Sequence, residues 1–216
     1  MLPTLPNPVR YHLTLLRHGE SVGNAEGKHQ GQSDFPLTEK GEAQVRALAE
    51  RWLNERKCFD LLISSPLSRA RGTAEILAEA LHLTLELNPL WMERDNGLLA
   101  GLRPEEAIAS YPRPPFIHPY LPIGQTGESQ WELYLRAGKA IQDLLHHPPG
   151  NYLIVSHGGI LNMVLYAILG ITPQANFYGP RFRFGNTAFA TLTYNPGEHK
   201  WYVHGLNDRV HWQHGE

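Results

Sequence analysis

Four short stretches of the sequence place an arginine, a histidine or a glutamate at or just after the end of an apolar run. In LLRHGES the run ends at Arg17 and His18, while Arg69 lies in SSPLSRA, His157 in VSHGG and Glu93 in WMERDNG. If these runs are neighbouring parallel strands, their carboxyl ends share one rim of a sheet, which is where ligands bind in open α/β folds. We therefore expect these five side chains to converge on one site.

Two guanidiniums, two imidazoles and one carboxyl suit a phosphoryl group. Forked arginine donors match tetrahedral oxygens and stay charged at any working pH, and helix N-termini expected after Arg69 and Gly158 would add oriented N–H groups. A histidine that attacks phosphorus must be neutral, and nearby guanidiniums should lower the pKa of His18 because they disfavour a further positive charge. Its second ring nitrogen needs a partner, either a backbone carbonyl near Gly19 or a neighbouring polar group. Glu93 is the candidate proton donor to the departing alkoxide.

The elements that must position these residues follow from hydrophobic periodicity. The pattern predicts strands at 11–16, 59–65 and 151–157, each followed along the chain by a helix, at 37–55, 66–83 and 158–170. Alternating residues at 187–195 and 199–207 predict a closing hairpin. Strands that alternate with helices indicate an α/β fold of three α/β/α layers with a mainly parallel central sheet, to which the hairpin adds an antiparallel edge.

Local signals define the ends and faces of the expected helices. Thr38 can cap the first helix, Pro66 is expected in the first turn of the second, and Gly170 should end the third. The expected apolar stripe of the first helix consists of Ala43, Val45, Leu48, Trp52 and Leu53.

Residues 1–216 are expected to form a single domain, of which 98–130 is a lid or cap. This segment is rich in proline and polar residues and has no clear period, which is typical of a binding loop. Its aromatic residues Tyr111, Phe116 and Tyr120 either line a substrate pocket or are merely exposed.

The composition excludes several classes of function. The 216 residues carry a formal net charge of −2, with 42% apolar residues and a single cysteine, Cys58. This predicts a globular protein with no electrostatic footprint for nucleic acid or a membrane surface and no intrachain disulfide. The N-terminus lacks the pattern of a secretory signal, its prolines indicate an extended lead-in, and no apolar run reaches ~18 residues. We expect a cytoplasmic location.

The chain resembles the histidine phosphatase superfamily, and within it the phosphoglycerate mutase-like branch of cytosolic enzymes with an Arg-His-Gly motif. The resemblance rests on an ordered set of stretches that spans nearly the whole length: LLRHGESVGN, QGQSDFPLTEKGEAQ, ISSPLSRARGTAE, MERDNG, VSHGGI, GNTAFATL and GLNDRVHW. It implies the phosphoglycerate mutase-like fold with a cap of loops and helices. Arg-His-Gly alone would carry little weight.

The resemblance also implies roles for individual residues. His18 would become phosphorylated, Arg17, Arg69 and His157 would form the phosphate pocket, and Glu93 would act as the acid and base. Positions that contact phosphate or substrate in relatives are occupied here by Asn24, Gln30, Gly31 and the Gly158 amide. Neither a metal nor an organic cofactor is implied, and the expected partner is a small-molecule phosphate ester.

Three functions remain open on the sequence. The first is a phosphomonoesterase that acts through a phosphohistidine on small phosphorylated metabolites. The second is a cofactor-dependent phosphoglycerate mutase that interconverts 2- and 3-phosphoglycerate and uses 2,3-bisphosphoglycerate; against it, the interval from Glu93 to His157 lacks the paired arginines of mutases. The third is a non-catalytic module that binds a phosphorylated ligand. A homodimer through an exposed edge strand is a further possibility.

Each candidate residue also has a purely structural interpretation. Arg69 would then pair with Glu75 or Asp60 on a helix surface, and Glu93 with Arg94 or Arg103. His157 would be a core histidine with its hydrogen bonds satisfied, and Gln30 and Gly31 would form a turn. Among the basic residues between Glu93 and His157, Arg136 and Lys139 lie in an expected helix.

Overall fold

The computed structural model describes residues 9–212; the expected extended lead-in at 1–8 and the last four residues lie outside this range. Within it, the chain forms a sheet with strand order β3-β2-β4-β1-β5-β6. The strands are β1 Tyr11–Arg17, β2 Leu61–Ser64, β3 Leu85–Leu87, β4 Asn151–Ser156, β5 Phe189–Asn195 and β6 Lys200–Asp208. The pairings among β3, β2, β4 and β1 are parallel, and β5 and β6 are antiparallel. This confirms the expected mainly parallel sheet and its C-terminal hairpin.

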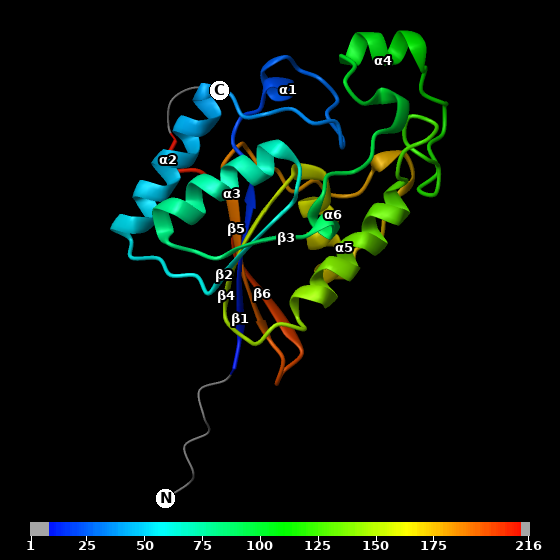
Figure 1. Ribbon diagram of the computed structural model, residues 1–216. Coiled ribbons are helices and arrows are strands. Elements are labelled where there is room, and N and C mark those ends of the chain that lie inside the picture. Colours follow the sequence, from blue (N-terminus) through cyan, green and yellow to red (C-terminus); the bar gives the residue numbers. More distant parts are fainter. Residues whose placement is uncertain (1–8, 213–216) are drawn as a thin grey trace, which may run out of the picture.

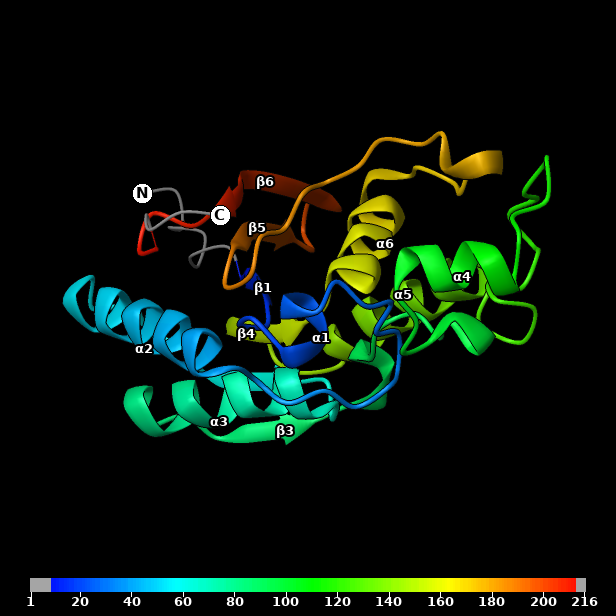
Figure 2. The same cartoon turned by 90° about the horizontal axis from the view of Figure 1, so that it is seen from above.

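Helices cover both faces of the sheet (Figures 1 and 2). One face carries α2 Glu39–Asn54 and α3 Ser68–Leu81, and the other carries α5 Gln130–Leu144 and α6 Gly158–Leu169. The short helix α1 Val22–Ala25 lies above the sheet in Figure 1, and α4 Pro104–Ser110 lies at the far upper right. The fold is therefore the three-layer α/β/α arrangement that the pattern of elements predicts.

Alternating strand residues fill two cores, because successive side chains of a strand point to opposite faces. In β1, Leu13 and Leu15 pack with α5 and α6, whereas Leu16 packs with α2 and α3. In β4, Ile154 and Val155 divide in the same way. Burial of one such aliphatic side chain contributes roughly 1.5–3 kcal/mol, so the central strands are firmly held on both sides.

The buried face of α2 differs from the expected stripe. Val45, Leu48 and Trp52 are buried as predicted, but Ala43 and Leu53 are exposed. At 100° per residue, positions 43 and 53 lie away from the direction shared by the three buried residues. Gln44 and Ala49 lie closer to that direction and are buried in their place.

The starts of the helices largely follow the sequence signals. Thr38 caps α2, its hydroxyl accepting a hydrogen bond from Gly41 N–H at 3.0 Å. Pro66, however, is not in the first turn of α3, because the helix begins at Ser68 and Leu67 is its N-terminal cap. Gly170 ends α6 in the left-handed conformation at φ 69°, which glycine adopts without a steric penalty.

The N-terminus of α2 packs closely against the loop that follows β1. A Cβ atom at Gly41 would lie 2.0 Å from the backbone oxygen of Glu20, so no larger residue fits without a shift of the backbone. Thr38 N–H also donates to Glu20 O at 2.9 Å. The start of α2 therefore fixes the course of the chain two residues after His18.

The segment 98–130 is mostly irregular and contains α4 and part of the short 3₁₀ helix Gly97–Leu99. Phe116 and Tyr120 are each 56% exposed, and Tyr120 packs on Trp131 with ring centroids 5.1 Å apart. Three expectations stay predictions: that residues 98–130 act as a lid, that the chain forms a single domain, and that it dimerises through the edge strand β6. No helix within 9–212 is both long and apolar enough to span a bilayer.

Candidate active site

The strand register brings the predicted residues together. Arg17 at the end of β1 is paired with Ser156 at the end of β4, so His18 and His157 follow at the same level of the sheet. Their ring centroids are 5.0 Å apart. Arg17, His18, Arg69, Glu93 and Gly158 all line one cavity of about 360 Å³. Four of the five side chains expected to converge thus line this cavity, whereas the fifth, His157, is not a lining residue but lies beside the ring of His18.

His18 is held by the backbone on one side of its ring. Nδ1 lies 2.6 Å from the carbonyl oxygen of Gly19, and the amide of Gly19 donates to Thr73 Oγ1 at 3.0 Å. A carbonyl only accepts, so in the neutral ring the proton is on Nδ1 and Nε2 presents a lone pair. Of the two partners left open by the sequence, the Gly19 carbonyl is the one found.

The environment of His18 favours the neutral imidazole. The side chain is 2% exposed, and burial lowers its pKa well below the ordinary value of 6.5. The positive charges of Arg17 and Arg69 lower the pKa further, while the hydrogen bond to Gly19 opposes the shift. The predicted direction is confirmed, with burial as its largest cause.

Both arginines of the cavity are fixed by backbone carbonyls. Arg69 donates from Nη2 to Gly31 O at 2.6 Å and from Nη1 to Ser33 O at 2.9 Å, and Arg17 donates from Nη1 to Phe184 O at 2.7 Å. Both Nε atoms are buried without a hydrogen-bond partner in the described part of the chain. Because buried donors are normally satisfied, two such N–H groups in one cavity indicate a site for an anion.

Arg69 does not form the helix-surface pair that its structural interpretation required. It is 1% exposed, and Glu75 pairs instead with Arg71 at 2.7 Å. Burial lowers the pKa of Arg69 to about 10, although Glu93 and Asp34 oppose the shift. The guanidinium therefore remains charged at neutral pH.

His157 is the N-terminal cap of α6 and is fully buried. Its Nε2 lies 2.8 Å from Ser65 Oγ, and its Nδ1 is a further buried atom without a partner among residues 9–212. Burial lowers its pKa well below the ordinary value, and His18 and Arg69 lower it further. A Ser65 hydroxyl that donates to Nε2 leaves the proton of the neutral ring on Nδ1.

Glu93 is bound to the N-terminus of α6 rather than paired with a basic side chain. Its carboxylate accepts hydrogen bonds from Gly159 N–H at 2.9 Å, Ile160 N–H at 3.1 Å and Arg94 N–H at 2.8 Å. A Cβ atom at Gly159 would lie 2.3 Å from Oε1. Only glycine at this position therefore leaves room for the carboxylate.

Two residues that the sequence did not single out hold the backbone of Glu93. Arg136 on α5 donates from Nη1 to the carbonyls of Leu90 and Met92 and from Nη2 to the carbonyl of Glu93. Glu128 accepts from Arg136 Nη2 at 2.6 Å and from Nε at 2.8 Å. Gln32 also donates to the Glu93 carbonyl at 3.0 Å. An arginine in an amphipathic helix gives no sequence signal for such a role, and neither does a glutamine in a loop.

The predicted substrate-binding residues divide into two groups. Gln30, Gly31 and Gly158 line the cavity, and Gly31 adopts a positive φ of 52°. Asn24 is not among the lining residues. Its Oδ1 accepts from the Ser21 backbone at 3.2 Å and from Asn186 Nδ2 at 3.1 Å.

The other nitrogen-bearing side chains at this cavity are those of Lys28, His29, Arg94 and Asn96. Asn186 supports the site from behind by donating to His18 O at 3.1 Å. Within residues 9–212 no cluster of three histidine, cysteine or acidic side chains is placed to hold a metal ion.

Three comparisons identify the family. The model of the histidine phosphatase superfamily, branch 1, matches residues 13–209. The chain belongs to this superfamily. A relative from Yersinia pestis (strain Pestoides F), named "Probable phosphoglycerate mutase GpmB", is 33% identical over 207 residues, which is 91% of this chain and 93% of the relative.

Solved structures of the superfamily share the fold. The alpha-ribazole phosphatase from Shigella flexneri superposes with a TM-score of 0.78 at 25% identity, over 92% of this chain and 96% of that one. A mutant phosphoserine phosphatase from Entamoeba histolytica, in complex with phosphoserine, gives a TM-score of 0.75 at 26% identity, over 93% and 98%. Members of this superfamily with this fold are thus named as phosphatases or as mutases.

Proposed function

We propose that the protein is a phosphomonoesterase that acts through a phosphohistidine at His18 on small phosphorylated metabolites. The observation that carries the proposal is the combination at one cavity of a neutral imidazole with a free Nε2 and two charged arginines with unpartnered Nε–H groups. A phosphoryl group placed there meets a nucleophile on one side and cationic donors on the others.

In the first step, Nε2 of His18 forms a bond to phosphorus while the bond from phosphorus to the ester oxygen breaks. Glu93, in its protonated form, gives its proton to the departing alkoxide, and Arg17, Arg69 and His157 hold the charge on the transferring oxygens. In the second step, water forms a bond to phosphorus while the bond from phosphorus to Nε2 of His18 breaks, and the attacking water gives a proton to the Glu93 carboxylate. Inorganic phosphate leaves, and His18 returns to its neutral state.

A phosphoglycerate mutase is the second candidate, because the Yersinia relative carries that name. A mutase would form the same phosphohistidine but return the phosphoryl group to a sugar acid rather than to water. Against it, arginines around the site are scattered along the chain and include no adjacent pair between Glu93 and His157.

The two candidates separate in one set of assays. Incubation with p-nitrophenyl phosphate and with 3-phosphoglycerate should release inorganic phosphate and yield an acid-labile phosphoenzyme that His18→Asn does not form. Interconversion of 2- and 3-phosphoglycerate that depends on added 2,3-bisphosphoglycerate would identify a mutase. Tight binding of phosphate esters with neither turnover nor a phosphoenzyme would identify a non-catalytic module and refute both.

We also propose that segment 98–130 covers the bound substrate, since Arg113 from this segment and Arg94 just before it line the cavity beside the site. We expect hydrolysis to need neither a metal nor an organic cofactor. A screen of phosphorylated metabolites with detection of released phosphate is the way to find the physiological ester.

A further inference from the structure

A second and larger cavity, of about 670 Å³, adjoins the one around His18. The two share Arg94, Gly158 and Gly159 as lining residues. Gly159 is also the residue whose amide holds the Glu93 carboxylate. A group that departs with a proton from Glu93 therefore has this second cavity directly beside it.

The second cavity is cationic. Four arginines line it, Arg94, Arg113, Arg181 and Arg183, and its lining residues include no acidic side chain. Arg113 and Arg181 make no hydrogen bond or ion pair within residues 9–212. Arg94 is placed by a hydrogen bond to Asn96 and lies over the ring of Phe177, 5.8 Å from its centroid.

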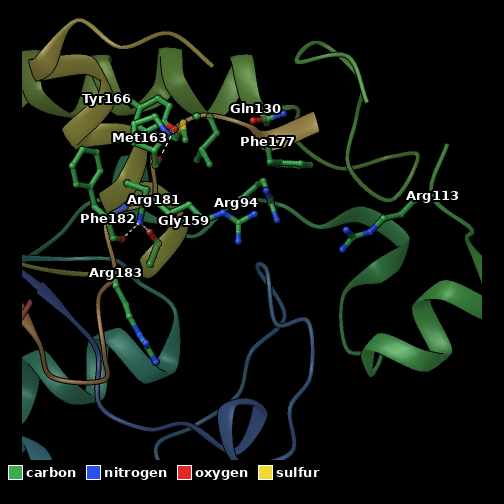
Figure 3. Close-up of a pocket in the computed structure, with 15 residues that line it drawn as sticks. Arg94, Arg113, Gln130, Gly159, Met163, Tyr166, Phe177, Arg181, Phe182 and Arg183 are labelled. Atoms are coloured by element: carbon green, nitrogen blue, oxygen red, sulfur yellow. Dashed lines mark hydrogen bonds between the residues drawn. The ribbon is translucent and has the colours of Figure 1, made fainter. Parts of the chain in front are cut away.

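The charges of these arginines act on one another. Burial is the main cause that lowers the pKa of Arg94, and the positive charges of Arg181 and Arg113 lower it further, against Glu93 and Glu128. In Figure 3 the guanidinium groups of Arg94 and Arg113 are turned toward the open centre of the cavity. Like charges around a concave wall focus a positive potential, which an anion would relieve.

The remaining wall is largely apolar. It includes Leu133, Met163, Tyr166, Phe177 and Phe182, and Figure 3 shows Tyr166 and Met163 together at one end of the cavity. Such a surface stabilises an apolar portion of a ligand by removing it from water.

Few groups are available to bind neutral hydroxyls. The amide of Asn162 is already bonded to Phe182 on both of its atoms, and the Tyr166 hydroxyl donates to Pro180 O at 2.6 Å. A polyhydroxylated leaving group would therefore find neither Asn162 nor Tyr166 free to replace the hydrogen bonds that it loses to water.

Resting on the proposed phosphatase function, we propose that the leaving group of the physiological ester carries a second anionic group, bound by Arg113 and Arg181, on an apolar or aromatic body held by the wall around Tyr166. The second anion is a carboxylate or a phosphate. The shared wall at Arg94 and Gly159 connects its site to the reacting phosphoryl group.

Two isosteric esters test this proposal, 4-carboxyphenyl phosphate and its neutral amide analogue 4-carbamoylphenyl phosphate. We expect kcat/KM to be at least about tenfold higher for the charged ester, which corresponds to about 1.4 kcal/mol. The double variant Arg113→Ala, Arg181→Ala should bring the ratio of the two values close to one. Because a ratio is compared, a general loss of activity in the variant cancels.

Arg103→Ala is the matched control, since Arg103 belongs to the same cap segment but is not a lining residue of either cavity. It should leave the ratio as in wild type. 1,4-Phenylene bisphosphate extends the series. The kcat/KM of this ester and that of 4-carboxyphenyl phosphate are each divided by the value for the neutral amide ester. The larger of the two ratios identifies the second anion as phosphate or carboxylate.

The proposal is overturned by a wild-type ratio of one or less, or by a ratio that is unchanged in the double variant. Hydrolysis of the neutral ester that depends on His18 would still uphold the phosphatase function in that case. If neither ester is hydrolysed faster by wild type than by His18→Asn, the phosphatase function itself fails. Circular dichroism of each variant verifies that it is folded.

Discussion

The cavity around His18 and the larger cavity beside it differ in how two of their arginines are held. Arg17 at the end of β1 and Arg69 in the first turn of α3 are anchored to backbone carbonyls of loops. Arg113 and Arg181 are exposed, lie in connecting segments and have no hydrogen-bond or ion-pair partner within the described chain. Anchored donors cost no reorganisation when charge develops on a phosphoryl group. In the proposed function the arginines on loops would contact the rest of the substrate, so the first cavity suits a common chemistry and the second a choice of substrate.

The largest expected effect comes from replacing His18, the proposed nucleophile, in the cavity where Arg17 and Arg69 are anchored (the anchored cavity). His18→Asn should lower the rate of phosphate release by at least about 10⁴-fold, the scale seen when a member of a catalytic unit is removed. The measurement is phosphate release under saturating ester. His12→Asn, at the other end of β1, should retain wild-type activity. Formation of the same amount of phosphoenzyme in His18→Asn as in wild type, even at a lower rate, would contradict the assignment.

Replacement of an anchored arginine should have the second-largest effect on activity. Arg69→Ala removes a preorganised cationic donor and should lower kcat/KM by ~10²–10³-fold. Arg71→Ala is the matched control, because Arg71 lies two residues away and pairs with Glu75 on the exposed side of α3. A change below twofold in Arg69→Ala would show that the buried donor does not contact the phosphoryl group.

Arg136 sharpens the comparison, because it is a lining residue of neither cavity but fixes the backbone carbonyls around Glu93. Arg136→Ala should misplace the Glu93 carboxylate and lower kcat by up to about 10²-fold with little change in KM. The loss should be larger for an alkyl phosphate than for p-nitrophenyl phosphate, whose leaving group needs less help from an acid.

Lys139→Ala on the same helix is the control for Arg136, since the Lys139 ammonium donates to Gln142 Oε1 at 3.3 Å and Lys139 is a lining residue of neither cavity. An equal loss for both esters would assign Arg136 a general structural role and not the positioning of Glu93.

The smallest effect is on stability. The pKa values of His18 and His157 are lowered in the folded state, so the unfolded chain binds more protons below the ordinary value of about 6.5. The free energy of unfolding should therefore fall as the pH drops from 6.5 toward 5, with a slope of at most about 1.4 kcal/mol per pH unit for each histidine. Urea titrations at several pH values measure the slope, which should be shallower in His18→Asn; an equal slope would mean that this ring does not stay neutral.

Much of the anchored cavity could be predicted from the sequence. Arg17, His18, Arg69 and His157 each stand at or near the end of a buried run, and the register of parallel strands brings such positions to one rim. The carbonyl partner of His18 is a neighbour in sequence, so local geometry limited the choices.

The support of Glu93 could not be predicted in the same way. Its partners Gly159 and Arg136 are distant in sequence and lie on two different helices, so they follow from packing rather than from any local pattern. The aromatic wall of the second cavity was not predicted from the sequence either. It consists of Tyr166, Phe177 and Phe182, whereas the sequence directed attention to the aromatic residues of 98–130.

The close approach of Gly41 to Glu20 O links the loop that follows His18 to an outer helix of the molecule. Fraying of the first turn of α2 would release the Thr38 and Gly41 contacts and free the chain beside His18 to move. Heat should thus abolish the proposed turnover at temperatures where the bulk of the sheet still persists, and a tighter cap at position 38 would extend the thermal range of that activity without any change at the cavity around His18.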